Sequence, residues 1–405
     1  MRVSTAYSYE TTIATLQRRQ SELSQAQEQM TSGKRVAKPS DDPAGIARAE
    51  RALAEEGRGK TLQRGVDASR NSMTLTESGL GDAIDLTQTA REALVEAGNA
   101  SYSSSERAAL ATKLRQLRSQ LLAVANQTDG AGGYLFGGQG AKATPFADGL
   151  DASGNPAVTT SSSGGQSNAS SSEDLPLTVD GQAVWMQAYS GNGSFESGAA
   201  AANTGNAWIA AGAVTDPSAL TGNDYAVQFS VDAAGVTTYS VTQGGAGTAL
   251  SNVPYVSGTS IAIDGMKFAI SGTPANGDQF DIVPSQPSLS VFSAIDKTLV
   301  TLENTNANGG QVQQAVNSGL RDLDQVLGKF QSARAMVGET LNRLDTVESR
   351  TGARILAART TRSNAEDLDM VQAASEFSNK QTSYQAALQS YAMVQKLSLF
   401  QYVNG

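Results

Sequence analysis

The run from Val316 to Glu348 constrains the fold most, because it repeats in heptads without a slip. Its seam positions follow one another at alternating spacings of four and three residues: Val316, Leu320, Leu323, Leu327, Phe330, Arg334, Val337, Leu341, Leu344 and Glu348. This spacing keeps the side chains on one face of a long helix. Residues 288–405 contain no proline, so nothing there forces a helix to end. A soluble helix of this length must bury its apolar face against another helix.

The first 130 residues supply partners for that helix. We expect helices at 5–31 and from about 43 towards 99. In the break between them, Gly33 is a C-cap, and Ser40-Asp41-Asp42-Pro43 is a helix start with an Asp or Ser cap and Pro in the first turn. Ser103 and Glu106 form a capping box that opens a third helix. The second helix repeats its apolar face every seven residues, at Met73, Leu80, Thr87 and Leu94.

Each end of the chain carries a thinner apolar stripe. Four residues recur every seven positions near the N-terminus, and four more with Leu388 do so near the C-terminus: Tyr9, Leu16, Leu23 and Met30, then Met370, Phe377, Tyr384 and Tyr391. The companion seam positions are often polar, as at Gln20 and Gln27. Such helices are marginal alone, so we interpret these nine residues as an assembly interface.

The segment 139–287 differs in charge and in period. It holds two basic residues against twelve acidic ones, whereas the flanks hold 28 basic and 27 acidic residues. Alternating apolar residues at 224–231 and 236–241 flank a turn and predict a β-hairpin. Asp180-Gly181 and Asp264-Gly265 are expected to be hairpin turns, and Gly132–Gly138 a short hairpin. The sequence therefore predicts an acidic, all-β insert.

The predicted fold class is α+β, with a long antiparallel helical coiled-coil shaft built from both chain ends and an inserted β-rich domain. We expect an N-terminal assembly helix and turn (1–42), the first half of the shaft (43–138), the insert (139–287), the second half of the shaft (288–364) and a C-terminal assembly helix (365–405). The predicted shaft core is apolar throughout: Leu110, Leu114, Leu117, Leu121, Leu320, Leu323, Leu327, Phe330, Leu341 and Leu344.

The composition argues against most enzyme chemistry. The chain has no cysteine and no histidine, which removes thiol catalysis, the usual zinc sites and His-based nucleophile activation. The glycines at 132–138 lack the Lys-Ser/Thr ending of a phosphate-binding loop, and no Asp-x-Asp pair fits a calcium-binding EF-hand loop. We therefore predict no catalytic, cofactor or metal residues. Without a basic patch or a long apolar window, we expect neither nucleic acid binding nor a membrane span.

Short motifs at both ends resemble the flagellin superfamily. These are MRVST at 1–5, TSGKRV at 31–36, PSDDP at 39–43, GYLFGG at 133–138 followed by TPF at 144–146, and KLSLF at 396–400. The insert matches only in kind, with GDQF at 277–280 as its best local likeness.

The resemblance implies a structural protein of the bacterial flagellum without enzymatic activity. It implies export through the flagellar type III apparatus without a cleaved signal, and an extracellular junction ring of like subunits that connects hook to filament. The implied partners are further copies, the first hook–filament junction protein, flagellin and a cytoplasmic flagellar export chaperone. Two alternatives stay open: flagellin itself, or a secreted adhesin carried by the insert.

Overall fold

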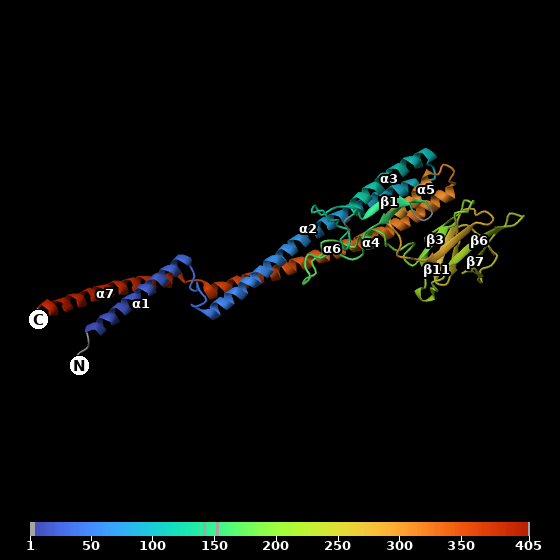
Figure 1. Cartoon of the computed structure of the whole chain (residues 1–405). Helices are drawn as coiled ribbons and strands as arrows, with labels where there is room; N and C mark the ends of the chain where they lie inside the picture. Colours follow the sequence, from blue (N-terminus) through green and yellow to red (C-terminus); the bar gives the residue numbers. More distant parts are fainter. Residues whose placement is uncertain (1–4, 141–142, 151–153, 404–405) are drawn as a thin grey trace. The chain divides into compact units, whose positions relative to one another are not determined.

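The computed structural model describes residues 5–140, 143–150 and 154–403 of the 405-residue chain. It divides into two compact units (Figure 1). The terminal unit contains the described residues up to Arg64 and from Val347, and the central unit contains those from Gly65 to Thr346. Two long helices, α2 (Pro43–Ala97) and α6 (Gly309–Glu366), contribute to both units.

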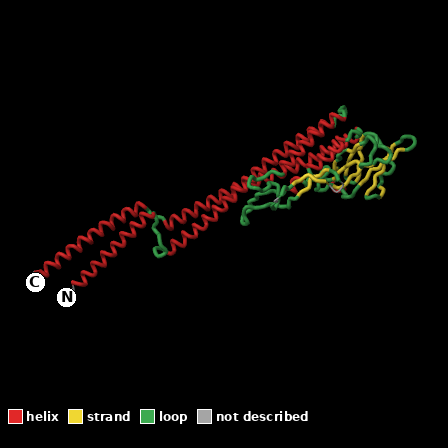
Figure 2. Tube along the Cα trace, turned by 45° about the horizontal axis from the view of Figure 1, so that its top comes forward, coloured by secondary structure: helices red, strands yellow, loops and turns green. Residues whose placement is uncertain are grey.

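In the terminal unit, the two ends of the chain form an antiparallel helix pair. Helices α1 (Thr5–Ser32) and α7 (Met370–Val403) lie side by side in both views (Figures 1 and 2). Gly33 ends α1 with φ +69°, and its N–H donates to the carbonyl of Gln29 at 2.9 Å. This left-handed C-cap is the predicted one. Asp42 accepts the N–H of Gly45 at 2.8 Å at the start of α2, which confirms the predicted helix start.

In the central unit, ion pairs between α2 and α6 show that the helices are antiparallel. Arg70 binds Asp345 at 2.7 Å, and Arg91 binds Asp324 at 2.7 Å, so positions rise along α2 as they fall along α6. Helices α3 (Ser104–Ala125) and α5 (Val291–Glu303) pack against each other. The capping box at Ser103 is present as predicted. The helical shaft built from distant parts of the chain is thus confirmed.

The seam of α6 in the central unit differs from the predicted seam by one residue at every second position. Buried residues along it follow three-four spacing: Val316, Gly319, Leu323, Val326, Phe330, Ala333, Val337 and Leu344. A side chain at Gly319 would meet Thr298 at 2.5 Å and Leu94 at 3.1 Å, so neighbouring helices approach closely there. The predicted seam position Arg334 was wrong, because its guanidinium lies outside and binds Glu77 at 2.6 Å. In the terminal unit, the predicted seam position Glu348 is half-buried and accepts a hydrogen bond from Gln63 of α2.

A second part of the central unit packs around Trp185. It comprises a hairpin of β1 (Phe146–Leu150) and β2 (Pro156–Thr160) and the short helix α4 (Gly181–Trp185). The Trp185 ring stacks on Phe292 of α5 at 6.0 Å between centroids and meets Phe330 of α6 at 4.8 Å. Phe136 and Phe146 complete this aromatic cluster.

The β domain (195–284) forms its own core. The elements of this domain are β3 (Phe195–Ala199), β4 (Trp208–Ile209), β5 (Ala213–Val214), η1 (Pro217–Ala219), β6 (Tyr225–Val231), β7 (Thr237–Gln243), β8 (Ala246–Gly247), β9 (Val253–Pro254), β10 (Ser260–Ile263), β11 (Met266–Ser271) and β12 (Gln279–Pro284). One sheet has the order β3-β12-β6-β7-β8 with β9 on β7, and another has β10-β11-β4 with β5 on β11. One apolar cluster contains side chains from both sheets, including Phe229, Phe280 and Phe268. The described part of 139–287 is therefore divided between two cores.

Turn chemistry was predicted correctly in part. The β6–β7 hairpin is confirmed, and Asp264-Gly265 is the two-residue turn between β10 and β11, with both residues at positive φ. Asp180-Gly181 is not a hairpin: Asp180 caps α4 by accepting the N–H of Ala183. A Cβ at Gly181 would lie 2.0 Å from the Phe136 carbonyl oxygen, so close backbone contact explains this glycine. The short hairpin predicted within 132–138 is absent from the described residues there, because Tyr134 pairs instead with the earlier Thr128 in an isolated antiparallel bridge and the Leu135 N–H donates to the Gln127 carbonyl.

Candidate assembly surface

The seam between α1 and α7 contains most of the predicted assembly residues. On each helix, the less exposed positions repeat at four-three spacing. Six of the nine predicted assembly residues are half-buried: Leu16, Leu23, Met30, Phe377, Tyr384 and Tyr391. Tyr9, Met370 and Leu388 are exposed. The sequence thus found the stripes, but the structure turns much of each stripe towards the other chain end.

This seam buries little. Apart from Ile13, its other half-buried positions are polar or small, including Thr12, Arg19 and Lys380. Among the side chains described on α1 and α7, only Ala26 and Ala373 are buried. A groove of about 500 Å³ opens between the helices, lined by Thr11, Thr15, Ser383 and Ser390 among others. Since helices of this kind depend on packing for stability, the pair is a weakly stabilised element.

Other apolar side chains on α1 and α7 face solvent. Tyr7 is 66% exposed, Val371 84% and Met393 61%. Sequence reasoning missed these three because they fall outside the heptad stripes. Exposed apolar side chains on a weak helix pair are typical of a surface that a partner covers.

The predicted shaft core lies inside the structure to different depths. Seven of its members are buried: Leu110, Leu114, Leu117, Leu121, Leu323, Phe330 and Leu344. The other three are half-buried: Leu320, Leu327 and Leu341. Gly319, Val326 and Ala333 take the more central positions.

Charged groups in both units are held by partners. The Lys60 ammonium and the Arg359 guanidinium bind the buried Glu56 carboxylate and hold its pKa at about 2, below the usual 4.5. In the central unit, Arg118 Nε lies 2.6 Å from Asp296 Oδ1. Burial raises the pKa of Asp296, and the Arg118 guanidinium opposes that shift. Both arrangements stabilise helix contacts.

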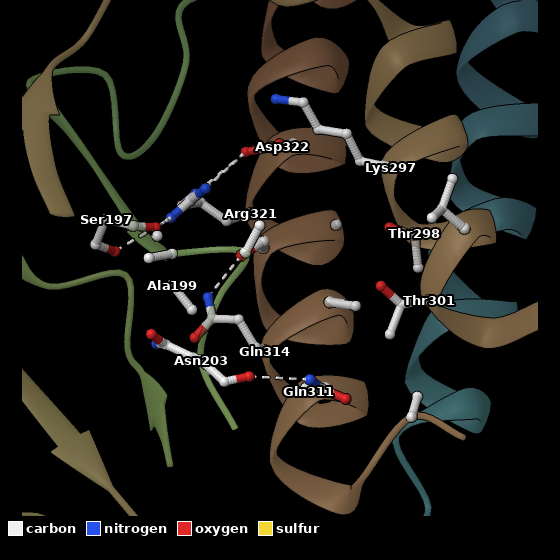
Figure 3. A pocket seen from close by; sticks show the side chains of 18 of the residues that line it. Ser197, Ala199, Asn203, Lys297, Thr298, Thr301, Gln311, Gln314, Arg321 and Asp322 are labelled. Carbon is white, nitrogen blue, oxygen red and sulfur yellow. Dashed lines mark hydrogen bonds and ion pairs between the residues drawn. The ribbon is translucent and has the colours of Figure 1, made fainter. Parts of the chain in front are cut away.

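A polar cavity of about 450 Å³ lies between β3 and helices α5 and α6 (Figure 3). Several of its polar groups bind one another: Arg321 Nη1 donates to the Ser197 carbonyl at 2.9 Å, and Gln311 Nε2 donates to the Asn203 carbonyl at 3.3 Å. Burial raises the pKa of Asp322, which accepts hydrogen bonds from Arg321. The hydrogen bonds around this cavity therefore connect the β domain to the shaft.

The described residues offer neither a metal site nor a membrane span. No group of three or more acidic, His or Cys side chains there is arranged to hold a metal ion. Within the same residues, no helix combines the length and apolarity that crossing a bilayer requires.

Known protein families match the helical ends and the β domain of this chain separately. The bacterial flagellin N-terminal helical region matches residues 3–141, and the C-terminal helical region matches 320–403. Residues 199–284 match the D2-like domain of flagellar hook-associated protein 1. The crystal structure of FlgL from Xanthomonas campestris is 30% identical, with a TM-score of 0.67, over 78% of this chain and 99% of that one. The chain belongs to the FlgL family.

Two curated relatives of the FlgL family carry the name flagellar hook-associated protein 3. The Salmonella typhimurium protein is 38% identical over 148 residues, which span 36% of this chain and only 46% of that protein. The Escherichia coli protein is 26% identical over 406 residues, covering 99% of both chains. The FlgL relationship confirms the resemblance to the flagellin superfamily and identifies a structural component of the flagellum.

Proposed function

We propose that this chain is a junction protein that connects the flagellar hook to the filament. It acts as a ring of like copies between the first hook–filament junction protein and flagellin. The observation that carries the proposal is the α1–α7 pair, whose seam is half polar while Tyr7, Val371 and Met393 remain exposed. Family membership supports the flagellar location.

Late ordering of the terminal helices fits this function. A chain exported unfolded must fold at its destination, and segments that bury apolar surface only on assembly order at that moment. We propose export through the flagellar type III apparatus without a cleaved signal, with a cytoplasmic chaperone holding the C-terminal helix beforehand. The absence of cysteine from the chain suits passage in an unfolded state.

We further propose that the protein has no enzymatic activity. Arg321 at the cavity is bound by the Ser197 carbonyl and the Asp322 carboxylate, and the chain has no histidine or cysteine to serve as base or thiol nucleophile. The relatives are flagellar structural proteins, which favours the same conclusion.

Deleting the gene tests the proposed function. The deletion strain should build hooks, release flagellin into the medium and fail to swim, and the full chain supplied in trans should restore filaments. Normal filaments in the deletion strain would contradict the proposal. If the deletion removed the main protein band of sheared filaments, the chain would instead be flagellin. If it abolished surface adhesion and left motility normal, the chain would be an adhesin.

A further inference from the structure

A groove in the terminal unit runs between α2 and α6. It has a volume of about 830 Å³. Its small residues are Ala52, Ala357 and Ala358, and its arginines are Arg48, Arg51 and Arg354. We call these six residues the arginine-rimmed groove.

The guanidinium groups of this groove have few partners. Arg48 and Arg51 each donate from Nε to a carbonyl of their own helix, at 3.3 and 2.9 Å. Among the described residues, none of the three groove arginines forms an ion pair, although Glu55 also lines the groove, where a hydrogen bond from Arg58 and the nearby Arg354 charge lower its pKa. Glu55, the carboxylate beside them, is already bound by Arg58. By contrast, Arg359 and Arg362 on the same helix bind Glu56.

This pattern indicates an acidic helical partner. Guanidinium groups bind carboxylates through parallel N–H donors, and a floor of alanines lets another helix approach closely. Exposed arginines are ordinarily solvated by water. Here three of them line one groove together with alanines, so one partner could bind all three guanidinium groups.

The chain carries a matching acidic face on α2. Asp82, Asp85 and Glu92 are exposed, and their spacing puts them on one side of the helix. Their carboxylates form no hydrogen bond or ion pair with other described residues. In the β domain, two of the acidic residues are already bound: Asp232 accepts backbone N–H groups of its own turn, and Asp278 accepts those of Thr204 and Ala275.

We propose that the arginine-rimmed groove of one copy binds the acidic face of α2 of a second copy. The two surfaces differ, so the contact is heterologous and continues from copy to copy, as a ring requires. This inference rests on the proposed self-assembly and adds a contact outside the terminal helix pair. Since the paired charges are exposed, the contact should weaken as salt rises.

Disulfide trapping tests the contact on purified full-length chain, because the chain has no native cysteine. An R51C chain is mixed at low salt with a D85C chain of different mass and then oxidised. We expect a mixed dimer that is lost at about 1 M salt, where the Debye length falls to about 3 Å. The matched control replaces R51C by K113C, at an exposed lysine on α3 without a described partner. Equal yields from both mixtures, or no mixed dimer, would overturn the proposal.

Charge reversal gives a second test that does not depend on trapping. R48E/R51E/R354E should lower motility in the deletion strain, and adding D82K/D85K/E92K should restore it. Additive losses from the two sets would overturn the proposed contact. Restoration of swimming by the unmodified chain is scored separately, so failure of the junction function is distinguishable from failure of this contact.

Discussion

The hydroxyl oxygens of Tyr9 and Tyr391 lie 2.6 Å apart, and their ring centroids lie 5.6 Å apart. These residues are separated by 382 positions in sequence. Their contact brings both ends of the chain into one helix pair, in which each helix supplies a stripe that the other only half covers.

Replacing either tyrosine by phenylalanine should weaken this pair slightly. The lost hydrogen bond is exposed, so we expect a cost of at most about 1 kcal/mol. A double-mutant cycle of Y9F and Y391F, read by the thermal loss of helical circular dichroism, measures the coupling. Strictly additive effects of the two substitutions would show that the hydroxyls do not interact.

The seam and the outer face of α7 should respond differently to substitution. Replacing Phe377, Tyr384 and Tyr391 by alanine should reduce helix content in the free chain, because these residues are half-buried against α1. Replacing Val371, Leu388 and Met393 by serine should leave the free chain helical and block ring formation. Circular dichroism and sedimentation of assembled particles check the two outcomes. Equal effects of both triple variants on the free chain would contradict the distinction.

The Glu56 cluster should make the terminal unit sensitive to acid. The pKa of Glu56 is about 2 in the folded chain and 4.5 ordinarily, so between these values the unfolded chain binds more protons. The stabilisation is therefore present above about pH 4.5 and is lost as pH falls towards 2. Helical circular dichroism against pH should show this loss in the natural chain but not in E56Q. E50Q, at an exposed glutamate on the same helix, should behave like the natural chain.

Two glycines should respond to alanine with opposite signs. G328A should stabilise α6 by about 0.5–1 kcal/mol, because the site is helical and a Cβ there meets nothing within 4 Å. G181A should destabilise the central unit by about 1–3 kcal/mol, since its Cβ would lie 2.0 Å from the Phe136 carbonyl oxygen. Urea unfolding measures both. A neutral G181A would show that the Phe136 backbone gives way easily.

The aromatic cluster should dominate the stability of the central unit. F330A removes a fully buried ring beside Trp185 and should cost about 3–5 kcal/mol. Urea unfolding followed by tryptophan fluorescence checks this value. V236A, at an exposed position in the β6–β7 loop, is the control and should change stability by less than about 0.5 kcal/mol.

Heptad spacing predicted the helices but not the centre of the seam. Positions such as Val316, Leu323 and Phe330 were found because they are large and apolar, whereas Gly319 and Ala333 were passed over because small residues bury little apolar surface. Their burial depends on how closely other helices approach, which is a tertiary property. Trp185 was assigned to the β insert for a similar reason, since its neighbours come from α5 and α6.

The heptad pattern of the sequence could not identify the outer apolar residues of the terminal helices. Val371 and Met393 stand out as exposed apolar residues only when the structure shows that the heptad seam faces the helix from the other chain end. The nine predicted assembly residues therefore stay a prediction about contacts between copies. Within the chain's own helix pair, six of them are half-buried and the exposed Tyr9 contacts Tyr391.

Hydrogen exchange of α1 and α7 tests the central claim most directly. Their amides should exchange rapidly in the free chain and become protected in isolated hook–filament particles, while α2 and α6 of the central unit are protected in both. Strong protection of α1 and α7 in the free chain, unchanged on assembly, would contradict the account.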